Sequence, residues 1–161
     1  MSALPVFPLR LRPVPGRDGW YRTRIGDWEE LEARVLALQD STQFGTWQVI
    51  CGLLDHENGH RIFVIDAVHP VELARQFGTG SHNAWDTEQV CNELAKVYDI
   101  APFRPYFIDP AGYKCRFVPA ISRQQANAIE EFITVGMEPY GDVESLAGTL
   151  VANIELRMWW D

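Results

Sequence analysis

The spacing of apolar and polar residues predicts a chain that alternates between helices and strands. In several stretches apolar residues recur every three or four positions, which is the period of a helix with one buried face. Residues that favour a helix start precede four of these stretches, namely Asp27, either Asp86 or Thr87, Ser122 and Asp142. Four longer helices and one short segment are expected, near residues 28–40, 87–99, 122–137 and 143–152 and near 70–77.

Shorter apolar runs predict strands. They lie at residues 47–54, 61–68, 103–108, 113–118 and 154–160. The last run alternates apolar and other residues, which is typical of a half-buried strand. Its expected buried side consists of Ile154, Leu156, Met158 and Trp160. Because neighbours on a strand face opposite ways, one of Trp159 and Trp160 is expected in the core, and the other is a possible binding surface.

Two predicted hairpins determine the expected fold class. The runs at 47–54 and 61–68 follow each other closely, and the next two runs are joined by Asp109-Pro-Ala-Gly112, with the Pro and Gly positions of a β-turn. We therefore expect an α+β fold with a mostly antiparallel sheet and about four helices. A chain of 161 residues, of which 47% are hydrophobic, suits a single domain over residues 1–161.

One motif resembles a catalytic site. His56-Glu57-Asn58-Gly59-His60 matches the H-E-x-x-H pattern, in which a helix presents two zinc-binding imidazoles and a glutamate that acts as general base. Here an Asn-Gly pair, which favours two-residue hairpin turns, lies between two predicted strands. We therefore predict a turn, with no metal site and no catalytic residues. A zinc-dependent hydrolase that uses His56, Glu57 and His60 is the alternative.

The charge is negative overall but unevenly distributed. The net charge is −8, yet residues 1–26 contain five Arg and one Asp, while residues 124–161 contain one Arg and seven carboxylates. The Pro/Arg-rich residues 1–26 predict an extended N-terminal arm or an edge strand, because proline cannot donate a hydrogen bond inside a sheet. The overall acidity disfavours direct nucleic-acid binding, which requires a basic surface.

Two further features indicate the cellular compartment. No apolar stretch is long enough to cross a membrane, and the first residues lack the pattern of a secretory signal. The odd number and wide spacing of Cys51, Cys91 and Cys115 do not suggest a disulfide framework. We expect reduced thiols in a cytoplasmic protein that has no membrane partner.

These features predict a non-catalytic, acidic binding protein with no cofactor. The expected partner is a basic protein, because surface carboxylates steer a cationic partner during association. The expected contact surface includes Glu138, Asp142 and Glu144, near the Pro-Gly turn between the last two predicted helices. A domain that binds an unidentified small ligand is a further possibility that the sequence leaves open.

The C-terminal part of the chain carries a family resemblance. Residues 142–161 combine a helix containing Leu-Ala, a short connection and a terminal Trp-Trp-Asp. Residues 125–140 look like a preceding helix, and residues 80–98 like an Asn-containing loop and helix. On these grounds residues 70–161 resemble an uncharacterised bacterial family, domain-of-unknown-function family 4253. The family has a Cys-Pro-Asp type of turn where this chain reads Met-Glu-Pro-Tyr from Met137.

The resemblance implies no activity and no site residues, because none are defined for the family. Small proteins related to it often lie beside polymorphic toxins, where acidic immunity proteins occur. The resemblance therefore makes the expected partner more specific. The protein is expected to be an immunity-type inhibitor of a basic toxin.

Overall fold

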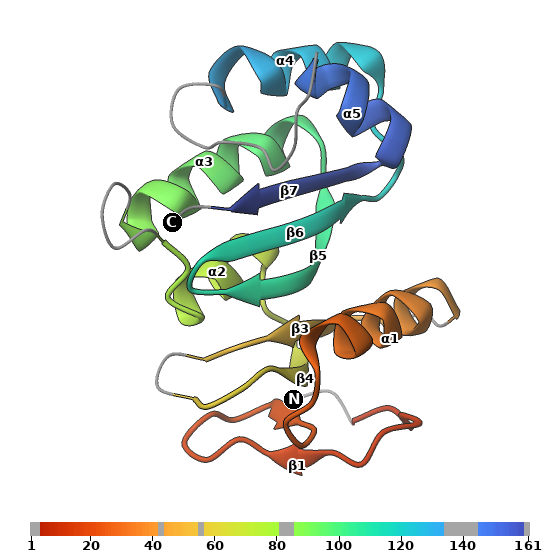
Figure 1. The fold of residues 1–161 in the computed structure, drawn as a ribbon, viewed down its shortest axis with the longest axis vertical. Coiled ribbons are helices and arrows are strands. Elements are labelled where there is room, and N and C mark those ends of the chain that lie inside the picture. The colour runs from red at the N-terminus through yellow and green to blue at the C-terminus, as the bar shows by residue number, and fades with distance from the viewer. Residues whose placement is uncertain (1–3, 42–43, 55–56, 81–85, 134–144, 160–161) are drawn as a thin grey trace.

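One mixed sheet runs through the described part of the chain. A computed structural model describes residues 4–41, 44–54, 57–80, 86–133 and 145–159. The sheet has seven strands in the order β1-β2-β4-β3-β5-β6-β7, and all neighbours are antiparallel except β3 and β5 (Figure 1). The strands are β1 (Arg12–Pro13), β2 (Trp20–Arg22), β3 (Trp47–Gly52), β4 (Arg61–Asp66), β5 (Phe103–Asp109), β6 (Gly112–Phe117) and β7 (Glu155–Trp159).

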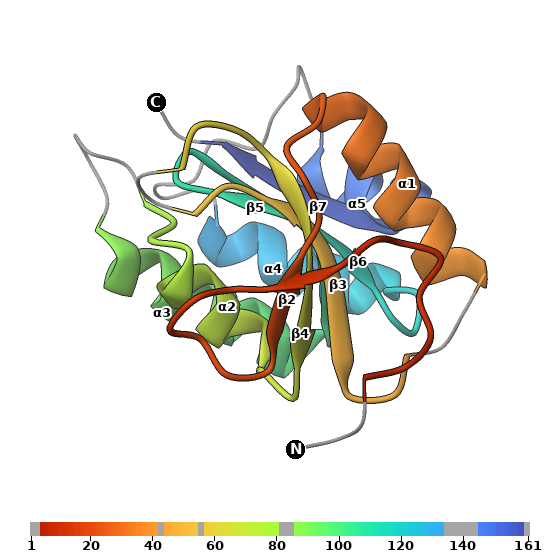
Figure 2. The same ribbon diagram turned by 90° about the horizontal axis from the view of Figure 1, so that it is seen from below.

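The helices cover the two faces of the sheet unequally. Within the described residues they are α1 (Trp28–Ser41), α2 (Pro70–Gln76), α3 (Thr87–Ile100), α4 (Arg123–Ile133) and α5 (Leu146–Asn153). Helices α2 to α5 pack on one face, and α1 packs on the other (Figure 2). The predicted α+β fold with a mostly antiparallel sheet is confirmed. Five helices are present instead of about four, because the short segment near 70–77 forms α2. None of these helices is long and apolar enough to cross a membrane.

The helix starts predicted at Asp27, Asp86 and Ser122 are confirmed by their hydrogen bonds. Asp142 lies outside the described residues, and α5 begins after the N-cap Ser145. The Asp27 carboxylate accepts from the backbone N–H of Glu29 and Glu30, at 3.0 and 3.2 Å. Asp86 and Ser122 each form a reciprocal capping box with a glutamine three residues later. Each cap satisfies backbone donors that lack a partner within the helix. These helices therefore begin where the sequence indicates.

The central strands are buried on both faces. In β4, Ile62 and Val64 pack beneath α1, while Phe63 and Ile65 face the other helices, and all four are fully buried. A strand that is covered on both faces needs apolar residues at successive positions, which explains the continuous apolar run of β4 in the sequence. At the edge of the sheet, β1 is short and contains Pro13, which has no backbone N–H to donate to a neighbouring strand.

An extra residue in β5 determines which side chains face α1. The pairing of β5 with β6 shifts between Pro105 and Phe107, so Tyr106 is a bulge residue. Tyr106 and Phe107 are both buried in the cluster beneath α1, although neighbours on a regular strand face opposite ways. The Gln39 amide of α1 donates to the carbonyl oxygens of Pro105 and Val49, both at 2.9 Å. This amide therefore ties α1 to the bulge.

The predicted hairpin of β3 and β4 is present, but its turn is not of the expected kind. The last paired residues are Gly52 and Arg61, so eight residues separate them instead of two. Neither Asn58 nor Gly59 has the positive φ that a type I′ turn requires. A Cβ on Gly59 would lie 2.6 Å from Cγ2 of Ile25. Close packing therefore accounts for the glycine in this structure.

Ile154 departs from the predicted alternation. The pattern places it on the buried side of the last strand, but it ends α5 in a left-handed conformation with φ of 58° and is 40% exposed. Its N–H donates to the Leu150 carbonyl at 2.9 Å, which holds this conformation despite its strain in a β-branched residue. Leu156 and Met158 are buried as predicted. Trp160 lies outside the described residues.

We predict that Gly52→Ala destabilises the protein by about 1–3 kcal/mol, because the added methyl group overpacks the core. A Cβ at Gly52 would lie 2.6 Å from a ring carbon of Phe77 and 2.8 Å from the Ile108 carbonyl oxygen. Phe77 is fully buried and the carbonyl belongs to a strand, so neither moves easily. Urea denaturation of the variant measures the loss.

Gly148→Ala is the matched control. A Cβ at Gly148 in α5 would find its nearest neighbours at 3.7–3.8 Å, which is ordinary contact. Its stability should be unchanged or higher by at most about 1 kcal/mol, because alanine favours a helix more than glycine does. Equal losses in the two variants would contradict the role of close packing at Gly52.

Candidate functional site

A groove opens between α1 and the strands β6 and β7. Its cavity volume is about 600 Å³, within the range of pockets that bind small ligands or side chains. We call it the aromatic groove. Its lining consists of Trp28, Glu29, Glu32, Ala33, Leu36, Lys114, Arg157, Met158 and Trp159.

Phe107 lies at the centre of the aromatic side chains here. The bulge at Tyr106 turns Phe107 toward α1, where its ring is buried. The ring of Trp28 meets it edge-on at a centroid distance of 6.0 Å, and Trp159 stacks on it at 6.5 Å. The His60 imidazole stacks on it at 5.5 Å. One buried ring thus holds side chains from α1, β7 and the segment before β4 in a single cluster.

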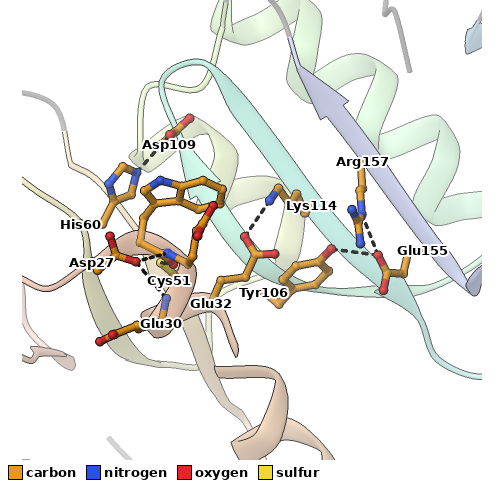
Figure 3. A network of polar contacts seen from close by, with 12 residues as sticks. Asp27, Glu30, Glu32, Cys51, His60, Tyr106, Asp109, Lys114, Glu155 and Arg157 are labelled. Atoms are coloured by element: carbon orange, nitrogen blue, oxygen red, sulfur yellow. Dashed lines mark hydrogen bonds and ion pairs between the residues drawn. The ribbon is translucent and has the colours of Figure 1, made fainter. Parts of the chain in front are cut away.

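Lys114 is the cation of this cluster. Its Nζ lies 5.0 Å from the centroid of the Trp28 ring and 4.7 Å from that of Phe107. The same ammonium donates to Oε2 of Glu32 at 2.6 Å, and both side chains are largely shielded from solvent (Figure 3). An ammonium between two aromatic faces is favourable, and the carboxylate neutralises its charge. Lys114 therefore links β6 to α1.

A second polar group lies along β7. The Tyr106 hydroxyl donates to Glu155 at 3.0 Å, and Nε of Arg157 donates to the same carboxylate oxygen at 2.9 Å (Figure 3). Burial, and then the Glu155 charge, raises the pKa of Tyr106 well above its ordinary value. The phenol therefore remains neutral and acts as a hydrogen-bond donor to Glu155.

His60 and Asp109 meet at the end of the aromatic cluster. Nε2 of His60 lies 3.2 Å from Oδ2 of Asp109, while Oδ1 accepts from the Ala111 N–H at 2.9 Å (Figure 3). The predicted β-turn from Asp109 to Gly112 is confirmed by the adjoining ends of β5 and β6. A Cβ on Gly112 would lie 2.6 Å from the Trp159 ring, so the turn glycine provides the space for that indole.

Within the described part of the H-E-x-x-H motif, the side chains of Glu57 and His60 have protein partners. His60 pairs with Asp109, as above. Glu57 forms ion pairs with Arg22 and with Arg61, the latter at 3.2 Å. His56 lies outside the described residues. Across the ranges that the structure describes, no cluster of three or more His, Cys, Asp or Glu side chains is placed to hold a metal ion.

Cys51 lies beneath Trp28 but is not an activated thiol. Its Sγ lies 3.8 Å from the Trp28 carbonyl oxygen, and its side chain is fully buried. Burial, followed by the charges of Glu32 and Asp109, raises the pKa of the thiol to about 12. The thiol is therefore protonated at neutral pH, whereas nucleophilic cysteines are thiolates.

The sequence-based site residues and this groove overlap little. Glu138, Asp142 and Glu144, predicted to contact a partner, lie outside the described residues. Trp159 is half-buried and lines the aromatic groove, so it combines packing with access to a ligand. Sequence reasoning assigned no role to Lys114. In the sequence, Lys114 lies between Tyr113 and Cys115 on a predicted strand. Because neighbours on a strand face opposite sides, Lys114 belongs on the face opposite to these two core residues.

Comparisons with known proteins do not assign this chain to a family. No protein-family model, curated protein or solved structure matches this chain. The resemblance of residues 70–161 to family 4253 therefore stays a prediction.

We predict that Lys114→Met lowers the free energy of unfolding by about 1–3 kcal/mol, because it leaves the shielded Glu32 carboxylate without its cation. Glu32→Gln in the same protein should recover part of this loss, since the uncompensated charge is then removed. A double-mutant cycle from chemical denaturation gives the coupling, expected at about 0.5–3 kcal/mol.

Lys96→Met is the control for removing a lysine. The Lys96 ammonium donates to Glu93 at 2.6 Å on the surface of α3, and its side chain is mostly exposed. Glu93 is only 16% exposed and the Lys96 ammonium also lies 5.7 Å from the centroid of the Phe132 ring, but water reaches this ammonium. Its pair with Glu93 is therefore expected to contribute only about 0–1 kcal/mol. Additive effects of the Lys114 and Glu32 substitutions would contradict the direct coupling.

Proposed function

We propose that the protein is a binding protein whose aromatic groove receives a basic segment of a partner protein. The observation that carries the proposal is the environment of Trp28. Its side chain is 40% exposed at the groove, although it is one of the largest apolar side chains in the molecule. Exposed carboxylates from Asp27, Glu29 and Glu30 surround it in the sequence. An indole beside carboxylates is a favourable site for a lysine or arginine side chain.

The pairing of charges within the groove supports binding as its role. Lys114 is neutralised by Glu32, and Arg157 by Glu155. The carboxylates of Glu29 and Glu30 have no side-chain partner within the described ranges. These carboxylates are therefore available to attract a cation, while the paired residues give the groove a fixed shape.

The nature of the exposed residues also supports a protein partner. Tryptophan is enriched among the residues that dominate binding energy at protein interfaces. Carboxylates at the rim mainly increase the rate at which an oppositely charged partner associates. An immunity-type inhibitor of a basic toxin would use both properties. This more specific role rests on the charge of −8 and on the resemblance of the C-terminal part.

We predict that Trp28→Ala weakens partner binding by about 2 kcal/mol or more, because the substitution removes the central aromatic anchor. The measurement is titration calorimetry with purified basic toxins encoded beside the gene for this protein. Val118→Ala is the matched control, since Val118 is 52% exposed and lies just after β6, outside the groove lining. It should bind as the unsubstituted protein does.

The paired variant Glu29→Gln/Glu30→Gln tests the charge component. It should slow association several-fold at low salt and reduce the salt dependence of the rate, while leaving the fold unchanged. If no basic candidate binds at low salt, the proposed partner class is wrong. If a partner binds and Trp28→Ala binds it equally well, the aromatic groove is not the contact surface.

The zinc-hydrolase alternative has its own measurement. Metal analysis of protein purified without chelator would detect stoichiometric zinc if His56, Glu57 and His60 form a metal site. We expect no stoichiometric zinc, because Glu57 pairs with two arginines and His60 with Asp109. Stoichiometric zinc that is lost in His60→Ala would replace the binding proposal with the hydrolase.

A further inference from the structure

A second groove lies on the other side of α1, where the N-terminal arm packs. Phe7, Leu9 and Leu11 of the arm are partly buried against the cluster beneath α1, and Phe7 stacks on Phe44 at a centroid distance of 4.5 Å. Arg34 of α1 donates to the Pro8 carbonyl at 3.2 Å. The arm is therefore held in place, and the surface between it and α1 has a defined shape.

This surface is a cavity of about 480 Å³ with an unusual concentration of positive charge. We call it the arginine groove. Four arginines line it, namely Arg10, Arg12, Arg24 and Arg34. No carboxylate is found among its described lining residues. In a chain of net charge −8, such a segregated group of cations requires an explanation.

Three of these guanidinium groups are available to a ligand. Arg10, Arg12 and Arg24 are exposed, and none of their guanidinium groups has a hydrogen-bonded or ionic partner in the portion of the chain that the structure describes. Arg12 also lies directly opposite Arg22 in the pairing of β1 with β2, an arrangement that like charges disfavour. Arg22 is neutralised by Glu57, whereas Arg12 is not. A bound anion would relieve this repulsion.

The floor of the arginine groove is apolar. Leu11 and Leu31 line it beneath the arginines, and both are partly buried in the core cluster. A ligand that fits both features has an anionic part for the guanidinium groups and an apolar part for the leucines. The planar fork of arginine matches the oxygens of a phosphate group particularly well.

We infer that the arginine groove binds a small phosphate ester, of about the size of a nucleotide, with its phosphate groups between Arg10, Arg12 and Arg24. The cavity volume falls within the usual range for small-molecule sites. A nucleic acid is the less favourable occupant, because the net charge of −8 repels an extended polyanion beyond the groove. This site is separate from the proposed partner surface and does not depend on it.

The inference is tested with ADP and inorganic pyrophosphate as the two probes, measured by titration calorimetry at low salt. ADP should bind saturably with one molecule per chain, and pyrophosphate more weakly, because only ADP has a part that contacts the leucines. Arg10→Gln and Arg24→Gln should each weaken ADP binding about tenfold or more, as expected for a charged hydrogen bond. Both residues are exposed, so the variants should fold normally.

Arg123→Gln is the matched control. Arg123 is exposed at the start of α4, and its removal changes the net charge by the same amount. It should bind ADP as the unsubstituted protein does. Methyl NMR spectra should show ADP-dependent shifts for Leu11, Ile25 and Leu31, while Val118, which follows β6 and lies outside the groove lining, should not shift.

Several outcomes would overturn the inference. The absence of saturable ADP binding at millimolar concentrations would show that the groove has no such ligand. An equal loss of binding in Arg123→Gln would show that overall charge, not the groove, attracts the nucleotide. If a single-stranded oligonucleotide binds more tightly than ADP and loses affinity in the Arg10 and Arg24 variants, the occupant is a nucleic acid instead.

Discussion

The arrangement of the α1 face depends on the hydrogen bonds from the Gln39 amide to the bulge in β5. The extra residue, Tyr106, shifts the pairing of β5 with β6, so that Tyr106 and Phe107 both point toward α1. A bulge frees backbone groups from the ladder, and one amide of α1 contacts the carbonyl oxygens of Pro105 and of the neighbouring Val49. The position of α1 and the orientation of Phe107 are thereby determined together.

The aromatic groove follows from this arrangement. With Phe107 facing α1, the rings of Trp28, Trp159 and His60 pack around it, and Lys114 lies over two of these rings. Glu32 of α1 then neutralises the lysine. Each of these contacts joins elements that are distant in the chain. The groove therefore has a fixed shape with its internal charges satisfied, which suits recognition of a partner.

The sequence predicted the local structure well because local rules govern it. The caps at Asp27, Asp86 and Ser122 and the apolar periods determine the helices, and the continuous run in β4 reflects burial on both faces. Local rules failed where a residue serves a tertiary contact. Gly59 makes room for Ile25 instead of forming a tight turn.

Ile154 likewise caps the end of α5 and does not occupy the buried strand position that the alternating pattern predicts. The groove itself could not be predicted from the pattern of residues. Its central ion pair joins Lys114 to Glu32 across 82 positions of the chain, and no periodicity marks such a pair. The bulge at Tyr106 could not be predicted from the sequence either, because an apolar run that contains a bulge has the same residue pattern as a regular strand.

Helix α1 forms a wall of both grooves. Trp28 and Glu32 face the aromatic groove, while Leu31 and Arg34 face the arginine groove. A helix of 14 residues moves as one body, so a ligand that shifts α1 changes both walls. Thermodynamic linkage requires that any effect of one occupied groove on affinity in the other is matched by an equal factor in the reverse direction. If a phosphate ester in the arginine groove shifted α1, it would act as an effector of partner recognition, and the partner would in turn regulate retention of the ester.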